Sequence, residues 1–291
     1  MTKQAYYKHD ESKVLSRAAR EAFALEYIKG IRAKDPGIGG VKLWHMYRRD
    51  FKGNAPLGRD RFVDIINEHN LKVRMKVRKP RTTDSSHGLP TYPNLVKDFI
   101  PTAPNQLWVS DITYITIWVD TWHYIFCYLS IILDAYTEEI IGWSVGPTLE
   151  TFYSLKALKM ALKRLNGKQG YQLIHHSDRG TQYASTEYIK QLKLNGITPS
   201  MTESGNPKDN AMAERINNTV KNELLHGKTF TSIRQVTDAV RKAVQFYNSE
   251  RPHSSLDWHT PDQAHRMSGE MKRHWHSWRE EAIRREQKVA V

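Results

Sequence analysis

The order of strand-like and helix-like segments between residues 105 and 225 places the narrowest limit on how this chain can fold. Three stretches rich in Val, Ile, Thr and Tyr follow one another with no helix between them: Leu107–Trp118, Trp122–Leu133 and Glu138–Gly146. Helical and strand-like segments then alternate as Glu150–Asn166, Tyr171–His176, Ser185–Asn195, Ile197–Met201 and Asp209–Leu225. This order predicts an α/β domain with a mixed five-stranded sheet flanked by helices.

Three acidic residues occupy distinct places in this predicted layout. Asp111 lies inside the first strand, Asp178 directly follows the fourth, and Glu214 lies in the first turns of the last helix. Burying a carboxylate among β-forming residues is costly unless a cation compensates it, and three oxygen ligands from three elements suit Mg²⁺. Taken singly, each acid is more often a hydrogen-bonded or solvated residue than a ligand. Their spacing favours a site, since 66 residues separate the two aspartates and 35 separate Asp178 from Glu214.

This spacing and the flanking residues resemble the DDE transposase and retroviral-type integrase superfamily. The resemblance is closest to the downstream-frame (OrfB-type) transposases of bacterial insertion sequences that are encoded in two overlapping frames. The motifs that carry it occur in family order and span much of the chain: Ser110–Tyr114, Ile141–Trp143, His176–Tyr183, Asp209–Ala211 with Glu214, and Tyr247–Asn248 with Arg251–His253.

The resemblance implies a ribonuclease-H-like catalytic core in which Asp111, Asp178 and Glu214 are the catalytic, metal-binding residues. Two Mg²⁺ or Mn²⁺ ions are expected as cofactors. The implied reaction is metal-dependent cleavage of DNA at the ends of an insertion sequence, followed by 3′-OH strand transfer into target DNA. Lys221 and Asn218 are expected to contact the DNA end, because at about 100° per residue they fall on the helix face of Glu214.

The family also implies partners. These are DNA, as terminal repeats and as target, and the upstream-frame product or a frameshift fusion to it; a homo-oligomer on DNA is expected. Two rival functions remain open: a ribonuclease-H-like nuclease without strand transfer, and a non-catalytic DNA-binding protein. With no signal peptide and no apolar stretch long enough to cross a bilayer, we expect a cytoplasmic, nucleoid-associated bacterial protein without membrane contact.

Positive charge is concentrated near the N-terminus. Of the formal net charge of +13, residues 1–100 contribute +10, which indicates a polyanionic partner. Predicted helices at Glu11–Lys34, Val41–Phe51 and Gly58–His69 are similar to a helix-turn-helix region, in which Arg59 and Arg61 would face DNA. A helical packing unit with solvated arginines would show the same pattern. In the first helix, apolar residues at spacings of three and four predict that one face is buried; they are Val14, Leu15, Ala18, Ala22, Leu25 and Ile28.

A run of alternating cations follows the third predicted helix. It comprises Lys72, Arg74, Lys76, Arg78, Lys79 and Arg81. Such a run is often a solvated tail, but beside a DNA-binding candidate an extended arm that contacts phosphates is the better interpretation.

The predicted organisation has four parts. They are a basic helical DNA-binding region (1–79), a Pro-rich linker (80–104), the catalytic core (105–265) and a C-terminal helical tail (266–291). Cys127 is the only cysteine, which excludes an intramolecular disulfide and a zinc site built on cysteines. The pair His175 and His176 is unsuited to binding one ion, because neighbouring strand residues point to opposite faces; we expect one ring near the active site and the other in the core.

Overall fold

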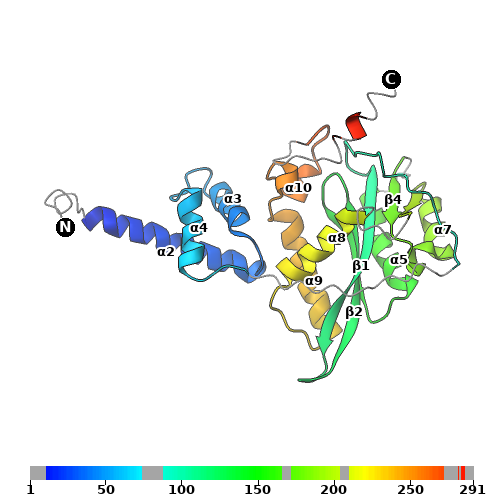
Figure 1. The fold of residues 1–291 in the computed structure, drawn as a ribbon, viewed down its shortest axis with the longest axis horizontal. Coiled ribbons are helices and arrows are strands. Elements are labelled where there is room, and N and C mark those ends of the chain that lie inside the picture. Colours follow the sequence, from blue (N-terminus) through cyan, green and yellow to red (C-terminus); the bar gives the residue numbers. More distant parts are fainter. Residues whose placement is uncertain are drawn as a thin grey trace. The chain divides into compact units, whose positions relative to one another are not determined.

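The chain divides into two structural units in a computed structural model (Figure 1), Met1–Lys76 and Val77–Val291. The structure describes residues 11–73, 88–165, 172–203, 210–271, 281 and 283–285. The predicted boundary between residues 79 and 80 falls outside these ranges. Among the described residues, no helix is both long and apolar enough to cross a membrane.

The first unit consists of three helices whose bounds lie within one residue of the predicted ones. They are α2 (Glu11–Lys34), α3 (Gly40–Asp50) and α4 (Arg59–Glu68). The apolar faces of the three helices meet in one small core, in which Tyr47 of α3 contacts Phe62 of α4 with ring centroids 4.9 Å apart.

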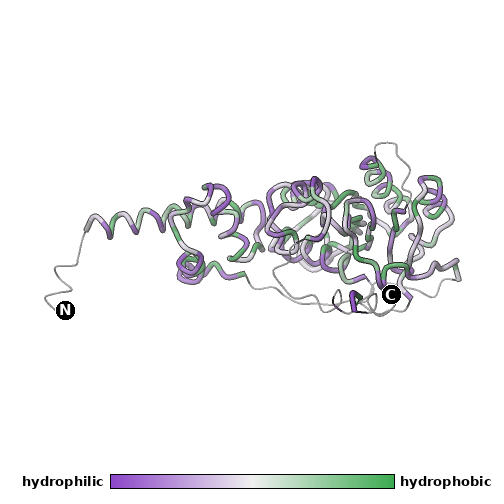
Figure 2. The backbone as a smooth tube through the Cα atoms, turned by 90° about the horizontal axis from the view of Figure 1, so that it is seen from above, coloured by the Kyte–Doolittle hydropathy of each residue, from purple (hydrophilic) through white to green (hydrophobic). Residues whose placement is uncertain are grey.

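The prediction of a buried face along the whole of α2 is wrong for its first half. Residues 12–20 are all exposed, and the side chains of Val14 and Leu15 are more than half exposed. Helix α2 has 24 residues, whereas α3 and α4 have 11 and 10. At about 1.5 Å per residue the two short helices can cover only part of the long one. Figure 2 shows hydrophobic and hydrophilic residues mixed along α2.

The second unit contains a five-stranded sheet in the order β3-β2-β1-β4-β5. Its strands are β1 (Leu107–Trp118), β2 (Tyr124–Asp134), β3 (Ile140–Gly146), β4 (Ile174–Ser177) and β5 (Thr198–Met201). The first three strands pair antiparallel, and β4 pairs parallel to both β1 and β5. This mixed sheet with its flanking helices confirms the predicted ribonuclease-H-like α/β fold.

The helices of the second unit include α5 (Thr151–Leu162) with η1 (Lys163–Leu165), α6 (Thr181–Ala184), α7 (Thr186–Leu194), α8 (Ala211–Asn218) with the π-helical turn η3 (Thr219–Leu224), α9 (Ile233–Ser249), η4 (Ser254–Leu256) and α10 (Pro261–Ala264). Three predicted helices flank the sheet with small changes of bounds, as α5, α7 and α8 with η3, whereas α6, α9, η4 and α10 were not predicted. Helix α5 packs so closely on β3 that a Cβ atom at Gly142 would lie 2.3 Å from the carbonyl oxygen of Ala157. The glycine of the Ile141–Trp143 motif therefore permits this helix–sheet contact.

Candidate active site

Strands β1 and β4 bring the two aspartates to the same part of the sheet. The parallel register pairs Val109 with His176. Asp111 and Asp178 each lie two residues further along the chain, at the same end of the two strands. After β4 the chain turns, and Oδ1 of Asp178 accepts a hydrogen bond of 3.0 Å from the backbone N–H of Gly180. A Cβ atom at Gly180 would lie 3.0 Å from that same oxygen, so the glycine leaves room for the carboxylate.

Helix α8 brings the third acid to this place through a neighbouring asparagine. The side-chain amide of Asn217 donates a 2.8 Å hydrogen bond to Oδ2 of Asp111, while Oδ1 accepts from the backbone N–H of Ile112 at 2.8 Å. Glu214 and Asn217 are three residues apart and so lie on one face of α8. Glu214 is exposed, but its negative charge raises the pKa of Asp111, so the two carboxylates lie near one another.

A second asparagine fixes the start of α8 to the same strand. Asn210, the N-cap residue of α8, donates from its side chain to the carbonyl oxygen of Ser110 at 3.0 Å. The hydroxyl of Ser110 lies 2.8 Å from that of Tyr183, which is buried in the core. The hydroxyl residue before the first acid thus anchors β1 to α6, and α8 is held on β1 at two points.

The electrostatics of Asp111 show that negative charge is concentrated here. Burial, and after it the negative charges of Asp178 and Glu214, raise the pKa of Asp111 to about 7, although two hydrogen bonds act to lower it. The named contributions to this pKa come from burial, from the two other acids and from two hydrogen bonds. The net effect disfavours the charged form of Asp111, and a bound cation would offset it.

The donor atoms suit a hard divalent cation by their chemistry. Carboxylate oxygens are available from three elements, and Oδ1 of Asn210 and of Asn217 are buried without a hydrogen-bond partner among the described residues; both atom types are ligands that Mg²⁺ accepts. Within the described ranges, however, no three His, Cys, Asp or Glu side chains are arranged so that they could hold a metal ion. Two features account for this. The carboxylates repel one another without a cation between them, and Oδ2 of Asp111 already accepts a hydrogen bond from Asn217.

Comparisons with known proteins assign the family. Two family profiles, both described as integrase core domain, match residues 101–207 and 195–261. A Shigella sonnei protein, the insertion element IS600 uncharacterized 31 kDa protein, is 38% identical over 229 residues, which cover 74% of this chain and 82% of that protein. The transposase for insertion sequence element IS629 of Shigella sonnei is 31% identical over 257 residues, covering 87% and 82%. This chain belongs to the insertion-sequence transposases.

The transposase is a DDE-type enzyme of DNA transposition and integration, which confirms the predicted activity. Among solved structures, the HTLV-2 integrase catalytic core domain in complex with magnesium aligns with a TM-score of 0.42 at 20% identity, covering 56% of this chain and 97% of that chain.

The transposase residues predicted to contact the DNA end lie on and after α8. Asn218 is exposed and accepts a 3.4 Å hydrogen bond from Asn222. Lys221 lies on η3, and its Nζ is 3.4 Å from the ring centroid of Tyr114 on β1. Burial lowers the pKa of Lys221. A π-helical turn advances by less than 100° per residue, so the direction of Lys221 relative to Glu214 differs from that in a continuous α-helix.

In the first unit of the transposase, the two predicted arginines have different surroundings. Arg61 donates to Glu21 at 2.9 Å and to both oxygens of Glu68 at 2.6 and 3.1 Å. These hydrogen bonds raise the pKa of Arg61 and join α2 to α4. Arg59 is exposed and contacts its neighbour Asp60 at 2.8 Å. Lys72 is exposed, and the other predicted arm residues lie outside the described ranges: Arg74, Lys76, Arg78, Lys79 and Arg81.

Both paired histidines are buried in the core, whereas only one was expected there. His175 is buried against Tyr188, with Nε2 3.0 Å from the tyrosine hydroxyl, and burial lowers its pKa to about 3. His176 is buried with Nδ1 2.9 Å from Oγ of Ser200. Strand β4 lies between β1 and β5 and is covered on both faces, as interior parallel strands usually are.

Sequence reasoning missed Asn217 as a site residue. Nothing in the spacing alone distinguishes it from Asn218, which was the asparagine selected as a DNA contact. The available signal was its three-residue separation from Glu214, which places both side chains on one helix face.

Proposed function

We propose that Asp111, Asp178 and Glu214 are the catalytic carboxylates of this transposase, and that they hold two Mg²⁺ or Mn²⁺ ions. The observation that carries the proposal is the hydrogen bond from Asn217 to Asp111, because it places the helix of Glu214 beside the strand pair that carries both aspartates. The negative charges of Asp178 and Glu214, which both raise the pKa of Asp111, further support a cation site. Bound ions would activate the attacking hydroxyl and stabilise charge on the phosphate in an in-line displacement.

The chain's own residues position this chemistry. Asn217 fixes the rotamer of Asp111, Gly180 fixes that of Asp178, and Asn210 holds the start of α8 on β1. Water cleaves a phosphodiester at the end of the insertion sequence and frees a 3′-OH. That hydroxyl then attacks a target phosphate and displaces a target 3′-oxygen, so the strand transfer itself leaves the number of phosphodiester bonds unchanged.

The test is cleavage of DNA that carries the ends of the element, with and without Mg²⁺, for the native protein and for Asp178→Asn. We expect cleavage only with the metal and only with the native protein. Activity that survives Asp178→Asn would contradict the assignment and favour a non-catalytic DNA-binding role. A second assay with a pre-cut 3′-OH end separates a transposase from a nuclease, because only strand transfer joins that end to target DNA.

We further propose that residues 1–79 form a DNA-binding region joined by a linker (80–104) to a catalytic core (105–265), with a C-terminal tail (266–291). The exposed cations Arg59 and Lys72 support phosphate contact, and the remaining arm residues are included on sequence grounds. Terminal repeats and target DNA are the proposed partners, together with the upstream-frame product or a frameshift fusion to it, in a homo-oligomer on the bacterial nucleoid. Adding the upstream product to the cleavage assay tests that dependence directly.

A further inference from the structure

An uncovered aromatic face lies at the far end of the β1–β2 hairpin. Antiparallel pairing sets Trp118 opposite Tyr124 and Thr116 opposite Phe126, and residues opposite one another share a face of the sheet. Tyr114, two residues before Thr116, shares this face. We call Tyr114, Trp118, Tyr124 and Phe126 the aromatic face.

The four rings form a continuous series of contacts. The centroid distances are 5.4 Å from Trp118 to Tyr124, 5.4 Å from Tyr124 to Phe126 and 4.8 Å from Phe126 to Tyr114. These contacts leave much of the rings accessible, since Trp118 is 37% exposed, Tyr124 52% and Phe126 40%. So much exposed aromatic surface on one face is unusual for a surface without a binding role.

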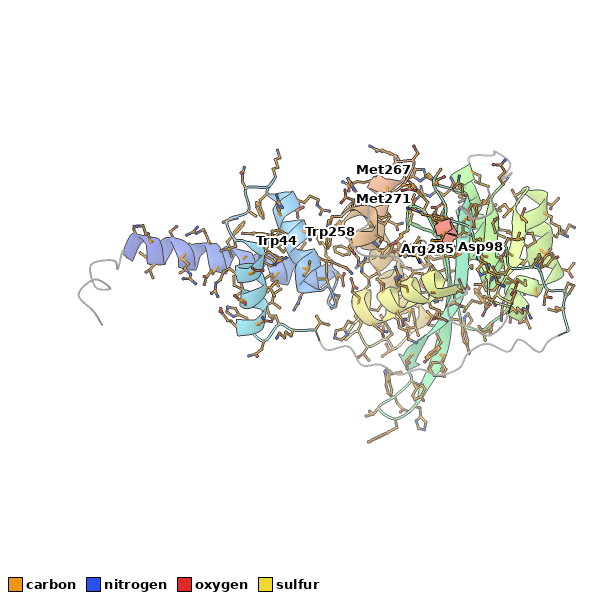
Figure 3. The ribbon with its side chains drawn as sticks, turned by 45° about the horizontal axis from the view of Figure 1, so that its top comes forward. Trp44, Asp98, Trp258, Met267, Met271 and Arg285 are labelled. Atoms are coloured by element: carbon orange, nitrogen blue, oxygen red, sulfur yellow. The ribbon has the colours of Figure 1, made fainter. Side chains whose placement is uncertain are left out.

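The aromatic face is exposed because the covering helix ends before it. Nearer the middle of β2, the same face is covered by α5, where Ser130 lies 3.3 Å from Ser154 between their hydroxyl oxygens. The opposite face of the hairpin is packed at Ile115, Ile117 and Cys127, which are buried, and exposed only toward the turn, at Ile125. Figure 1 shows β1 and β2 extending together beyond the helices, and Figure 3 shows side chains projecting from this end.

The hairpin end is also well defined. In the turn, the carboxylate of Asp120 accepts from the backbone N–H groups of Trp122 and His123 at 2.7 and 2.8 Å. The backbone N–H of Trp118 donates to the carbonyl oxygen of Phe230 at 2.8 Å. These bonds hold the aromatic rings on a formed strand pair, so their arrangement precedes any ligand.

Lys221 links the aromatic face to the proposed catalytic site. Its ammonium lies on the ring of Tyr114, the inner end of the face, and Asn217, four residues before Lys221, donates to Asp111. Tyr114 is three residues from Asp111 and so points to the other face of β1. Lys221 therefore reaches from the segment beside Asp111 to the aromatic face. At about 3.4 Å per strand residue, the four rings lie roughly 10 to 24 Å from Asp111 along β1. That range corresponds to about three to seven nucleotide steps of 3.4 Å.

We propose that the aromatic face binds unpaired DNA bases near the cleaved phosphate by stacking. Exposed aromatic rings on a sheet bind single strands in this way, because every base has a stacking surface. Lys221 at the inner end supplies the cation that a phosphate requires. The ammonium on Tyr114 and the hydrogen bond of nearby Asn217 to Asp111 connect the face to a DNA-cleaving site, which favours nucleic acid as its ligand. The inference rests on the proposed function, of which it specifies the substrate form.

The experiment compares binding of an oligo(dT) strand about 12 nucleotides long with binding of a blunt duplex of mixed sequence, both in EDTA so that cleavage does not enter. We expect the double variant Trp118→Ala/Tyr124→Ala to lose about tenfold or more in affinity for the single strand, and less than about twofold for the duplex. The slope of log affinity against log salt should stay the same, because stacking releases no counterions. Asp178→Asn should bind the strand normally, which separates this result from failure of the catalytic assignment.

Two matched variants keep the test independent of folding. Ile125→Ala removes an exposed side chain of the same strand on the opposite face and should leave strand binding unchanged. Trp118→Phe/Tyr124→Phe keeps stacking rings and should restore it. Unchanged strand binding by the alanine variant, or equal loss with Ile125→Ala, would overturn the proposal. The proposal would also be overturned if the alanine variant lost self-association in sedimentation while its strand binding stayed intact. That result would assign the face to a second copy of the chain.

Discussion

Asn217 donates its side-chain amide to Oδ2 of Asp111 over 2.8 Å, and so the helix that carries Glu214 is attached to the strand that carries the first aspartate. Together with the bond from Asn210 to the carbonyl oxygen of Ser110, it holds α8 on β1 at two points. The bond also favours the charged form of Asp111, against the burial that disfavours it.

Asn217→Ala should therefore reduce DNA cleavage by about 10- to 100-fold, the range found when residues that orient metal ligands are removed. The Mg²⁺ concentration needed for half-maximal rate should rise, because Asp111 loses a bond that lowers its pKa. The measurement is single-turnover cleavage against Mg²⁺ concentration. Asn195→Ala is the control, since Asn195 is remote on the C-cap of α7. An unchanged Mg²⁺ dependence for Asn217→Ala would contradict the positioning role.

Asp111→Asn should make the metal-free protein more stable at pH 8. The pKa of Asp111 is raised to about 7 from 3.8, so the folded chain retains a proton between these pH values that the unfolded chain has lost. Stability is therefore lost as pH rises through this window, and stays lost above it. Asp111→Asn removes this cost and should raise the free energy of unfolding by roughly 1–3 kcal/mol at pH 8, and by less at pH 5. Thermal unfolding in EDTA at both pH values measures it, and an equal gain at the two would exclude a raised pKa.

Gly142→Ala should destabilise the second unit by about 1–3 kcal/mol, because the new Cβ would lie 2.3 Å from a backbone oxygen of α5. Urea unfolding followed by circular dichroism measures the change. Gly30→Ala is the matched substitution, since nothing lies within 4 Å of a Cβ there. It should stabilise α2 by about 0.5–1 kcal/mol. Equal effects of the two substitutions would show that α5 can move away from the sheet at little cost.

Arg251→Met should cost about 3–5 kcal/mol, because it leaves Glu223 buried without its charge partner. The guanidinium of Arg251 contacts both carboxylate oxygens of Glu223, at 2.6 and 3.1 Å, and both side chains are buried. The double variant Arg251→Met/Glu223→Leu should recover much of the loss. Urea unfolding of the two variants decides this, and a double variant less stable than the single one would mean that the ion pair is not the main contribution.

Arg61→Ala and Arg59→Ala should separate packing from DNA contact in the first unit. Arg61 is held by Glu21 and Glu68, so its loss should lower the melting temperature of the helical unit. Arg59 is exposed beside Asp60, and its loss should weaken duplex binding and reduce the magnitude of the salt slope by about 1. Fluorescence anisotropy against salt concentration tests both, with Lys72→Ala compared in parallel. Loss of DNA binding at constant stability for Arg61→Ala would reverse the two roles.

The amino-acid sequence by itself determined the elements and the family. Helix α2 and strand β1 have the predicted bounds, because period and residue type act locally, and the motif around the three acids identified the transposases. Contacts between elements were decided only by the tertiary structure. Periodicity shows which residues share a face, but it does not show whether another element covers that face.

Two surfaces and one contact show this difference. The apolar side of α2 is exposed at Val14 and Leu15 because α3 and α4 are too short to cover it. The aromatic face is exposed because α5 does not reach the end of the hairpin. Asn217 rather than Asn218 contacts Asp111, because the hydrogen bond from Asn210 to Ser110 helps set the orientation of α8 on β1. Both bonds join residues that are 100 or more positions apart in the sequence. Sequence spacing placed the three acids in family order, and the fold determined which neighbours orient them.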